Sequence, residues 1–140
     1  MTPQRPRRDL FFWLLLGGAL ASAVHAGWML LFPAHWYHEL PADVPDTGPF
    51  NAHFVRDIGC AFATIALAFA WAAFQPRWRA PLLGVATFFL TAHALLHVYD
   101  TARGALHAHH WLLEAPSVYA PVLVLIPFTI RALREARAPA

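Results

Sequence analysis

The chain has 140 residues, of which 59% are hydrophobic and 13% are charged, a balance that excludes an ordinary soluble domain. Its ten basic residues are all arginine, and its formal net charge is only +2, which excludes a basic nucleic-acid-binding surface. We therefore expect an integral membrane protein with a single all-α transmembrane domain over residues 1–140. Its expected partner is the lipid bilayer, and we expect it to bind no nucleic acid.

Four apolar runs are long enough to cross the roughly 30 Å hydrocarbon core of a bilayer as helices. They cover residues 10–32, 54–74, 81–99 and 116–133. Pro33 ends the first run, Pro76 follows the second, and Pro81 suits the first turn of the third helix. Pro121 and Pro127 lie inside the fourth run, where neighbouring helices can satisfy the freed carbonyl groups. The pattern predicts an integral membrane four-helix bundle with kinks in the last span.

The first run also has features of a secretory signal peptide. Basic residues precede it, and Val24-His25-Ala26 resembles a cleavage site. However, the apolar run continues to Phe32, which is longer than the usual apolar region of a signal peptide. We therefore expect the first span to be an uncleaved membrane anchor.

The arginines indicate the orientation, because cytoplasmic flanks of membrane proteins carry an excess of basic residues. Eight of the ten flank the spans on one side: Arg5, Arg7, Arg8, Arg77, Arg79, Arg131, Arg134 and Arg137. The first and third connections instead carry most of the acidic residues, and Trp and Tyr residues lie near both edges of the spans, as in interfacial belts. The pattern predicts a multi-pass protein of the cell inner membrane with its N- and C-termini in the cytoplasm.

The two outer connections have distinct compositions. The first is dense in turn-forming residues around Asp46-Thr47-Gly48, so we expect it to fold back over the mouth of the bundle. The third contains the tract His107-Ala108-His109-His110. We interpret this tract as an interfacial loop segment, with weak metal binding as the alternative.

All nine histidines fall in the outer half of the protein once this topology is applied. In the third run, His93, His97 and Asp100 have i, i+4, i+7 spacing and share one helix face. Ionisable groups inside a membrane are costly and are candidates for function. The stripe predicts an outer-facing polar pocket, and Gly59 and Gly104 are predicted positions of close helix approach.

Polar residues of other runs can complete this pocket. His53, Arg56 and Asp57 begin the second run, and His25 lies in the outer half of the first. Two imidazoles at i, i+4, together with a third histidine and a carboxylate, suit a divalent metal such as Zn, Fe or Cu. If a metal is bound, the predicted ligands are His93, His97, His53 and Asp57, supported by His25, Arg56 and Asp100.

Three other interpretations of the same residues stay open. Haem could bind if His93 or His97 faces His25 or His53. A His/Asp pair could move protons in a small membrane oxidoreductase or isomerase that acts on a lipid-soluble substrate. The polar groups could also form a hydrogen-bonded plug in a purely structural accessory subunit. The sequence names no catalytic residue, and a homo-oligomer or a larger membrane complex stays open.

Three segments resemble a known family. They are HWYHELP at residues 35–41, VPDTGPFNAHFVRDIG at 44–59 and TAHALLH at 91–97. With its GPFNxHFxRDxG signature, the chain resembles a family of small four-span bacterial membrane proteins and, more distantly, the DoxX-type four-helix membrane proteins. The resemblance covers about residues 33–100 and implies the four-helix membrane fold. It implies no reaction and no catalytic residue.

Overall fold

The computed structural model describes residues 8–137, so Arg5 and Arg7 of the predicted cytoplasmic flank lie outside the described residues. The described chain is helical and contains no strand. Its long helices are α1 (Leu10–Leu31), α3 (Ala52–Phe74), α4 (Arg79–Ala102) and α6 (Ala120–Arg137). Shorter segments connect them: α2 (Pro33–Glu39), η1 (Val44–Thr47), η2 (Pro76–Trp78), α5 (His110–Leu113) and the π-helical η3 (Ala115–Tyr119).

Four helical segments are long and apolar enough to cross a membrane: Leu10–Leu31, Ala52–Phe74, Pro76–Ala102 and Ala115–Arg137. The chain is therefore a multi-pass membrane protein, and the predicted all-α four-helix fold is confirmed. The boundaries differ by a few residues at both ends of the spans, and the fourth helix continues to Arg137. The second span starts earlier than predicted, because the Asn51 side chain caps α3 by accepting from the backbone N–H groups of His53 and Phe54, both at 3.1 Å. In the last span, α6 continues through Pro127 without a break.

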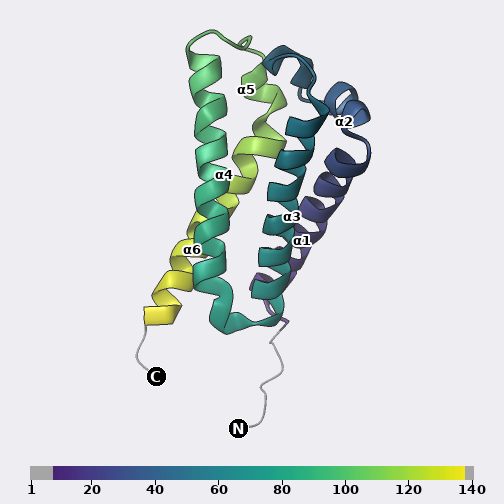
Figure 1. Ribbon diagram of the computed structural model, residues 1–140. Coiled ribbons are helices and arrows are strands. Elements are labelled where there is room, and N and C mark those ends of the chain that lie inside the picture. Colours follow the sequence, from purple (N-terminus) through teal and green to yellow (C-terminus); the bar gives the residue numbers. More distant parts are fainter. Residues whose placement is uncertain (1–7, 138–140) are drawn as a thin grey trace.

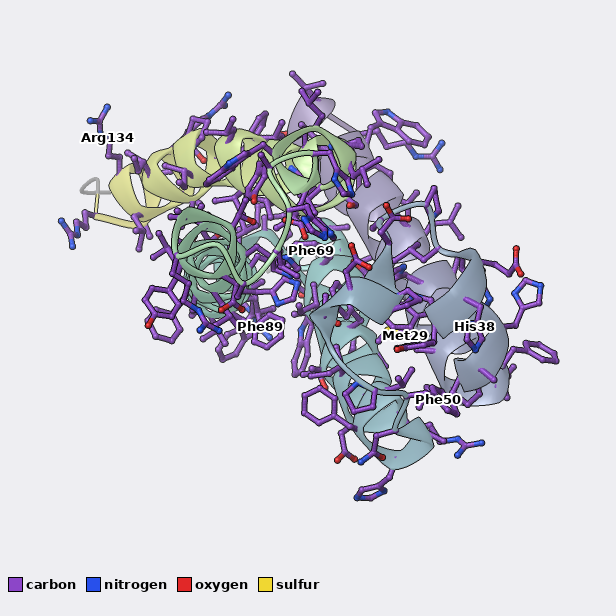
Figure 2. The ribbon with its side chains drawn as sticks, turned by 90° about the horizontal axis from the view of Figure 1, so that it is seen from above. Met29, His38, Phe50, Phe69, Phe89 and Arg134 are labelled. Atoms are coloured by element: carbon purple, nitrogen blue, oxygen red, sulfur yellow. The ribbon has the colours of Figure 1, made fainter. Side chains whose placement is uncertain are left out.

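The long helices are arranged as two pairs, with α1 packed along α3 and α4 packed against α6 (Figures 1 and 2). Gly59 lets α1 and α3 approach closely, because a Cβ at this position would lie 3.1 Å from both Met29 Cβ and Leu30 Cγ. The prediction for Gly59 is confirmed. The prediction for Gly104 is wrong, because a Cβ there would meet nothing within 4 Å. Gly104 instead has φ of 77° after the end of α4, a left-handed turn that favours glycine.

The two ends of the bundle differ in chemistry. Helix α1 begins and α6 ends at the same end, opposite α2 and α5 (Figure 1). We call this the arginine end, because it carries these described residues: Arg8, Arg77, Arg79, Arg131, Arg134 and Arg137. The opposite end, with the first and third connections, is called the histidine end.

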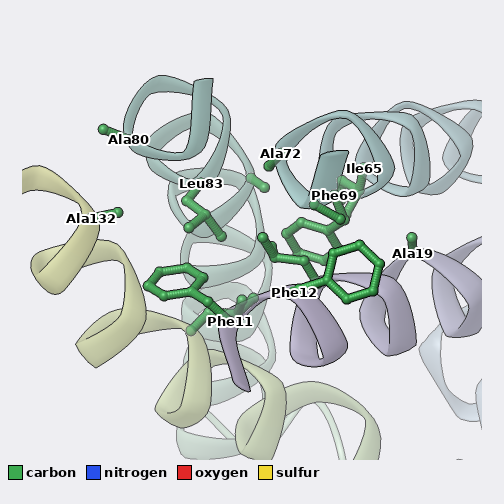
Figure 3. Close-up of a cluster of buried hydrophobic side chains, with 13 residues drawn as sticks. Phe11, Phe12, Ala19, Ile65, Phe69, Ala72, Ala80, Leu83 and Ala132 are labelled. Atoms are coloured by element: carbon green, nitrogen blue, oxygen red, sulfur yellow. The ribbon is translucent and has the colours of Figure 1, made fainter. Parts of the chain in front are cut away.

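The hydrophobic core lies toward the arginine end, and all four long helices contribute to it (Figure 3). Phe11 and Phe12 of α1 meet Phe69 of α3 and Leu83 of α4, each of them at most 5% exposed. Alanines of α3, α4 and α6 fill the remaining space: Ala72, Ala73, Ala80, Ala86 and Ala132. Apolar packing therefore holds the two helix pairs together at one end and leaves the other end to polar side chains.

Changing Gly59 to Leu should lower the thermal stability, because the added side chain has to push α1 away from α3. Overpacking of this kind costs about 1–3 kcal/mol. Gly17→Leu is the matched control on the facing helix, since a Cβ at Gly17 would meet nothing within 4 Å. Thermal unfolding in detergent, followed by circular dichroism, measures both variants. Equal midpoints would contradict a tight contact at Gly59.

Candidate functional site

A buried carboxylate, Glu114, lies at the centre of the histidine end and is 1% exposed. Three side chains surround it. The Tyr119 hydroxyl donates to Glu114 Oε2 at 3.0 Å. His110 Nδ1 lies 3.1 Å from Oε1, and His97 Nδ1 lies 2.8 Å from the same oxygen. Because a buried charge without partners is strongly unfavourable, these contacts determine where Glu114 sits.

The π-helical segment η3 places Tyr119 against Glu114. The backbone N–H of Tyr119 donates to the Glu114 carbonyl at 3.4 Å, five residues earlier, where an α-helix would use the residue four positions earlier. The wider turn allows the Tyr119 side chain to return to the Glu114 carboxylate. Single π-turns are frequent at functional sites in proteins.

His110 is fully buried between two carboxylates. Its Nδ1 faces Glu114, and its Nε2 lies 3.2 Å from Asp46 Oδ2. Burial by itself lowers the pKa of His110, but the hydrogen bonds and negative charges of Asp46 and Glu114 outweigh it and raise this pKa above the usual 6.5. When the ring is protonated, both nitrogens donate, one toward each carboxylate.

The first connection supplies two carboxylates to this end of the bundle. Asp43 adopts φ of 46°, and its carbonyl accepts from the backbone N–H of Asp46 at 2.9 Å, which forms the turn of η1. The turn holds Asp43 Oδ2 at 3.2 Å from His109 Nε2, while Asp46 contacts His110. The prediction that the first connection folds over the mouth of the bundle is confirmed.

Asp46, His109 and His110 form a group that we call the outer ligand group. One ligand atom of each lies within 4.8 Å of the other two, and no second such group of His, Cys, Asp or Glu occurs within residues 8–137. His110 is buried, whereas the side chains of His109 and Asp46 are 49% and 40% exposed. The group is therefore anchored inside the protein by His110 and open to solution through the other two. Sequence reasoning interpreted the tract as an interfacial loop segment and did not predict the burial of His110.

The structure does not bring together the four ligands named from the sequence. His53 Nε2 pairs with Asp57 Oδ2 at 3.4 Å on α3, and the side chain of His53 is 88% exposed. The Arg56 side chain donates to the backbone of α1 at 3.2 Å. Asp100 pairs with Arg103 at 2.9 Å. These side chains are thus paired with groups other than the histidines of the third span.

The three histidines inside the spans do lie together, on the membrane side of Glu114. The rings of His93 and His97 are 4.6 Å apart between centroids. His25 and His93 both pack against Phe62, at centroid distances of 4.8 and 6.3 Å. The short contact from His97 Nδ1 to Glu114 is out of line for a hydrogen bond, so this nitrogen has no hydrogen-bond partner among the described residues. His93 and His97 of the predicted stripe thus face protein, while haem ligation and proton chemistry stay predictions.

Sequence reasoning missed Glu114 and Asp46 as members of the site. Both lie in connecting segments, where acidic side chains are usually solvated. The i, i+4 spacing of His110 and Glu114 was an available signal, because residues at this spacing share a helix face. Asp46 offered no such signal, since it lies 64 residues from its partner His110.

These observations define a four-span membrane protein with a buried network of histidines and carboxylates at one end. No known protein family, no curated protein and no solved structure matches the chain. The resemblance to the small four-span bacterial family therefore stays a prediction.

The raised pKa of His110 predicts that the stability of the metal-free protein depends on pH. The stabilisation is fully present below the unfolded-state pKa of 6.5 and is lost as the pH rises through the higher folded-state pKa. Thermal midpoints in detergent with a chelator should therefore fall from about pH 6 to about pH 9. His110→Gln should remove most of this slope, whereas His53→Gln, at an exposed histidine of the same end, should keep it. An unchanged slope in H110Q would show that other groups cause the dependence.

Proposed function

We propose that the outer ligand group binds a divalent metal ion at the outer face of the membrane. The observation that carries the proposal is the 3.2 Å distance between His110 Nε2 and Asp46 Oδ2, with His109 alongside. Ligand atoms on a tetrahedral zinc ion, with bonds of about 2.0–2.2 Å, lie roughly 3.3–3.5 Å apart. A metal can therefore replace the proton between His110 and Asp46 with little movement of either side chain.

The partner of the second nitrogen of His110 supports the same proposal. Histidines that ligate metals usually donate their other ring N–H to a carboxylate, which determines the tautomer and the ring orientation. Glu114 occupies this position, with Oε1 at 3.1 Å from His110 Nδ1. His97 and Tyr119 in turn contact the Glu114 carboxylate. In the metal-bound form, Nδ1–H of His110 donates to Glu114 and Nε2 binds the ion.

The ligand types favour zinc or a similar first-row ion. Two imidazole nitrogens and one carboxylate oxygen suit such metals, whereas magnesium and calcium prefer oxygen ligands. Three protein ligands leave a fourth position for water or another small ligand. Because His109 and Asp46 are the exposed members of the group, this position lies on the solution side.

Zinc binding by the purified, chelator-treated protein tests the metal site. Calorimetry should detect binding to the parent, and His110→Gln or Asp46→Asn should abolish it by removing a ligand. Glu114→Gln should weaken it by about 10–100-fold, the usual effect of losing a carboxylate behind a ligating histidine. His53→Gln is the control, because this exposed histidine pairs with Asp57 outside the group.

Circular dichroism has to show that each variant is folded. Absence of zinc binding by the parent, or equal affinity in H110Q, would refute the metal site. If the parent binds no metal and H110Q only lowers its melting temperature, the result would instead support the structural interpretation. In that interpretation the network links the first and third connections.

We further propose that the protein lies in the cell inner membrane with its arginine end in the cytoplasm. The support is the gathering of basic residues at the end of the bundle where α1 begins and α6 ends (Figure 1). The same arrangement puts the outer ligand group in the periplasm, where it meets metal ions from outside the cell.

A reporter enzyme that is active only in the periplasm tests this orientation. Fused after Ala140, it should be inactive, because an even number of crossings returns the chain to the cytoplasm. Fused after Ala42, beyond the first span, it should be active and serves as the positive control. Reporter activity of the Ala140 fusion, or an inactive Ala42 fusion, would contradict the proposed topology.

A further inference from the structure

A cavity of about 180 Å³ lies between α4 and α6 at the arginine end. One wall consists of Arg77, Arg79 and Ala80, from η2 and the first turn of α4. The facing wall is formed by the last turns of α6, with the small side chain of Ala132 next to Glu135. The cavity thus combines two guanidinium groups with open space at a helix–helix boundary.

Arg79 is an unusually buried arginine, with a side chain that is 10% exposed. Its Nε donates to the carbonyl of Ala72 at 3.3 Å, and its Nη1 lies 3.4 Å from Asp9 Oδ2. Its Nη2 is buried and has no hydrogen-bond partner among the described residues. Because this atom is closed to solvent, Arg79 contributes its positive charge to the wall of the cavity rather than a free donor.

The carboxylates of this end do not balance the positive charge of its arginines. The described arginine end contains six arginines against two carboxylates, Asp9 and Glu135, an excess of four positive charges. Asp9 accepts from the backbone N–H of Phe12 at 2.8 Å besides contacting Arg79. Glu135 pairs with Arg131 at 2.7 Å. The electrostatics of the cavity therefore favour an anion from outside the chain.

The cavity lies at the level where membrane meets water. Trp71 and Trp78 are half-exposed at this end, with ring centroids 6.0 Å apart, and tryptophan prefers the headgroup layer of a bilayer. The guanidinium of Arg77 lies 5.8 Å from the centre of the Trp78 ring. Phosphate groups of membrane lipids occupy this same layer, so a lipid can place its phosphate at the cavity while its chains stay in the bilayer.

We propose that this cavity binds the phosphate group of an anionic phospholipid. The phosphate oxygens accept hydrogen bonds from Arg77, the positive charge of Arg79 lies in the same wall, and Ala80 and Ala132 leave room for the headgroup. Basic pockets between transmembrane helices are established binding sites for anionic headgroups. The inference does not depend on the metal site, which lies at the opposite end of the bundle.

Thermal unfolding in nanodiscs tests the lipid site. The midpoint of the parent should rise by several degrees when phosphatidylglycerol is added to phosphatidylcholine, because the lipid binds only the folded protein. Arg77→Gln should lose most of this rise. Arg134→Gln should keep it, because Arg134 carries the same charge at the same end but points away from the bundle (Figure 2) and does not line the cavity. Each rise is compared with the same variant in phosphatidylcholine alone, so a general effect of the substitution on folding cancels.

Three outcomes would overturn the proposal. No rise in the parent means that the cavity does not bind the lipid. Equal losses in R77Q and R134Q mean that the lipid acts through diffuse charge rather than through this site. The last measurement is the thermal midpoint of the parent in phosphatidylcholine nanodiscs with added inorganic phosphate. An equal rise with inorganic phosphate would assign the cavity to free phosphate instead of a lipid.

Discussion

A carboxylate removed from water has to be compensated by the protein, and the histidine end depends on this constraint at Glu114. Tyr119 reaches it from the start of the fourth span, His97 from the third span, and His110 from the third connection. His110 then contacts Asp46 of the first connection. One buried group therefore determines how these segments meet, and Asp46 of the outer ligand group is held in place by His110, a side chain that touches no solvent.

The contacts of His110 explain why a structural network and a metal site can share one geometry. Its Nε2 faces Asp46 and can carry either a proton or a metal ion. The proton is favoured by the two carboxylates, which raise the pKa of His110, and metal binding has to displace it. In both forms Glu114 accepts from Nδ1–H, so the buried part of the network is unchanged. The exposed side chains of Asp46 and His109 are the ones that adjust to the ion.

Apolar side chains pack at one end of the bundle, and polar side chains interact at the other. Apolar packing around Phe11, Phe69 and Leu83 joins the helix pairs near the arginine end, where the buried Arg79 also connects α4 to the start of α1. Polar side chains fill the corresponding space at the other end, with Phe62 between His25 and His93. The apolar core thus lies away from the histidines and carboxylates of the histidine end. The two ends of the bundle also differ in their charged groups, with six of the described arginines at one end and the buried imidazole–carboxylate network at the other.

The sequence by itself determined the membrane class, the four spans and the tight contact at Gly59, because apolar length and small residues are local properties of a helix. It also predicted that His93 and His97 share one helix face, because their spacing is i, i+4. Only the tertiary structure decided which polar residues form the site. Periodicity shows which residues share a face but not which face turns inward, so His53 and Asp57 could not be recognised as an exposed pair. Asp46 and His110 meet through the folding of two loops, and the burial of Glu114 depends on a π-helical turn. The i, i+4 spacing of His110 and Glu114 was a local signal for part of the site, whereas the contact of Asp46 with His110 is a product of packing between distant segments, which no local pattern in the chain encodes.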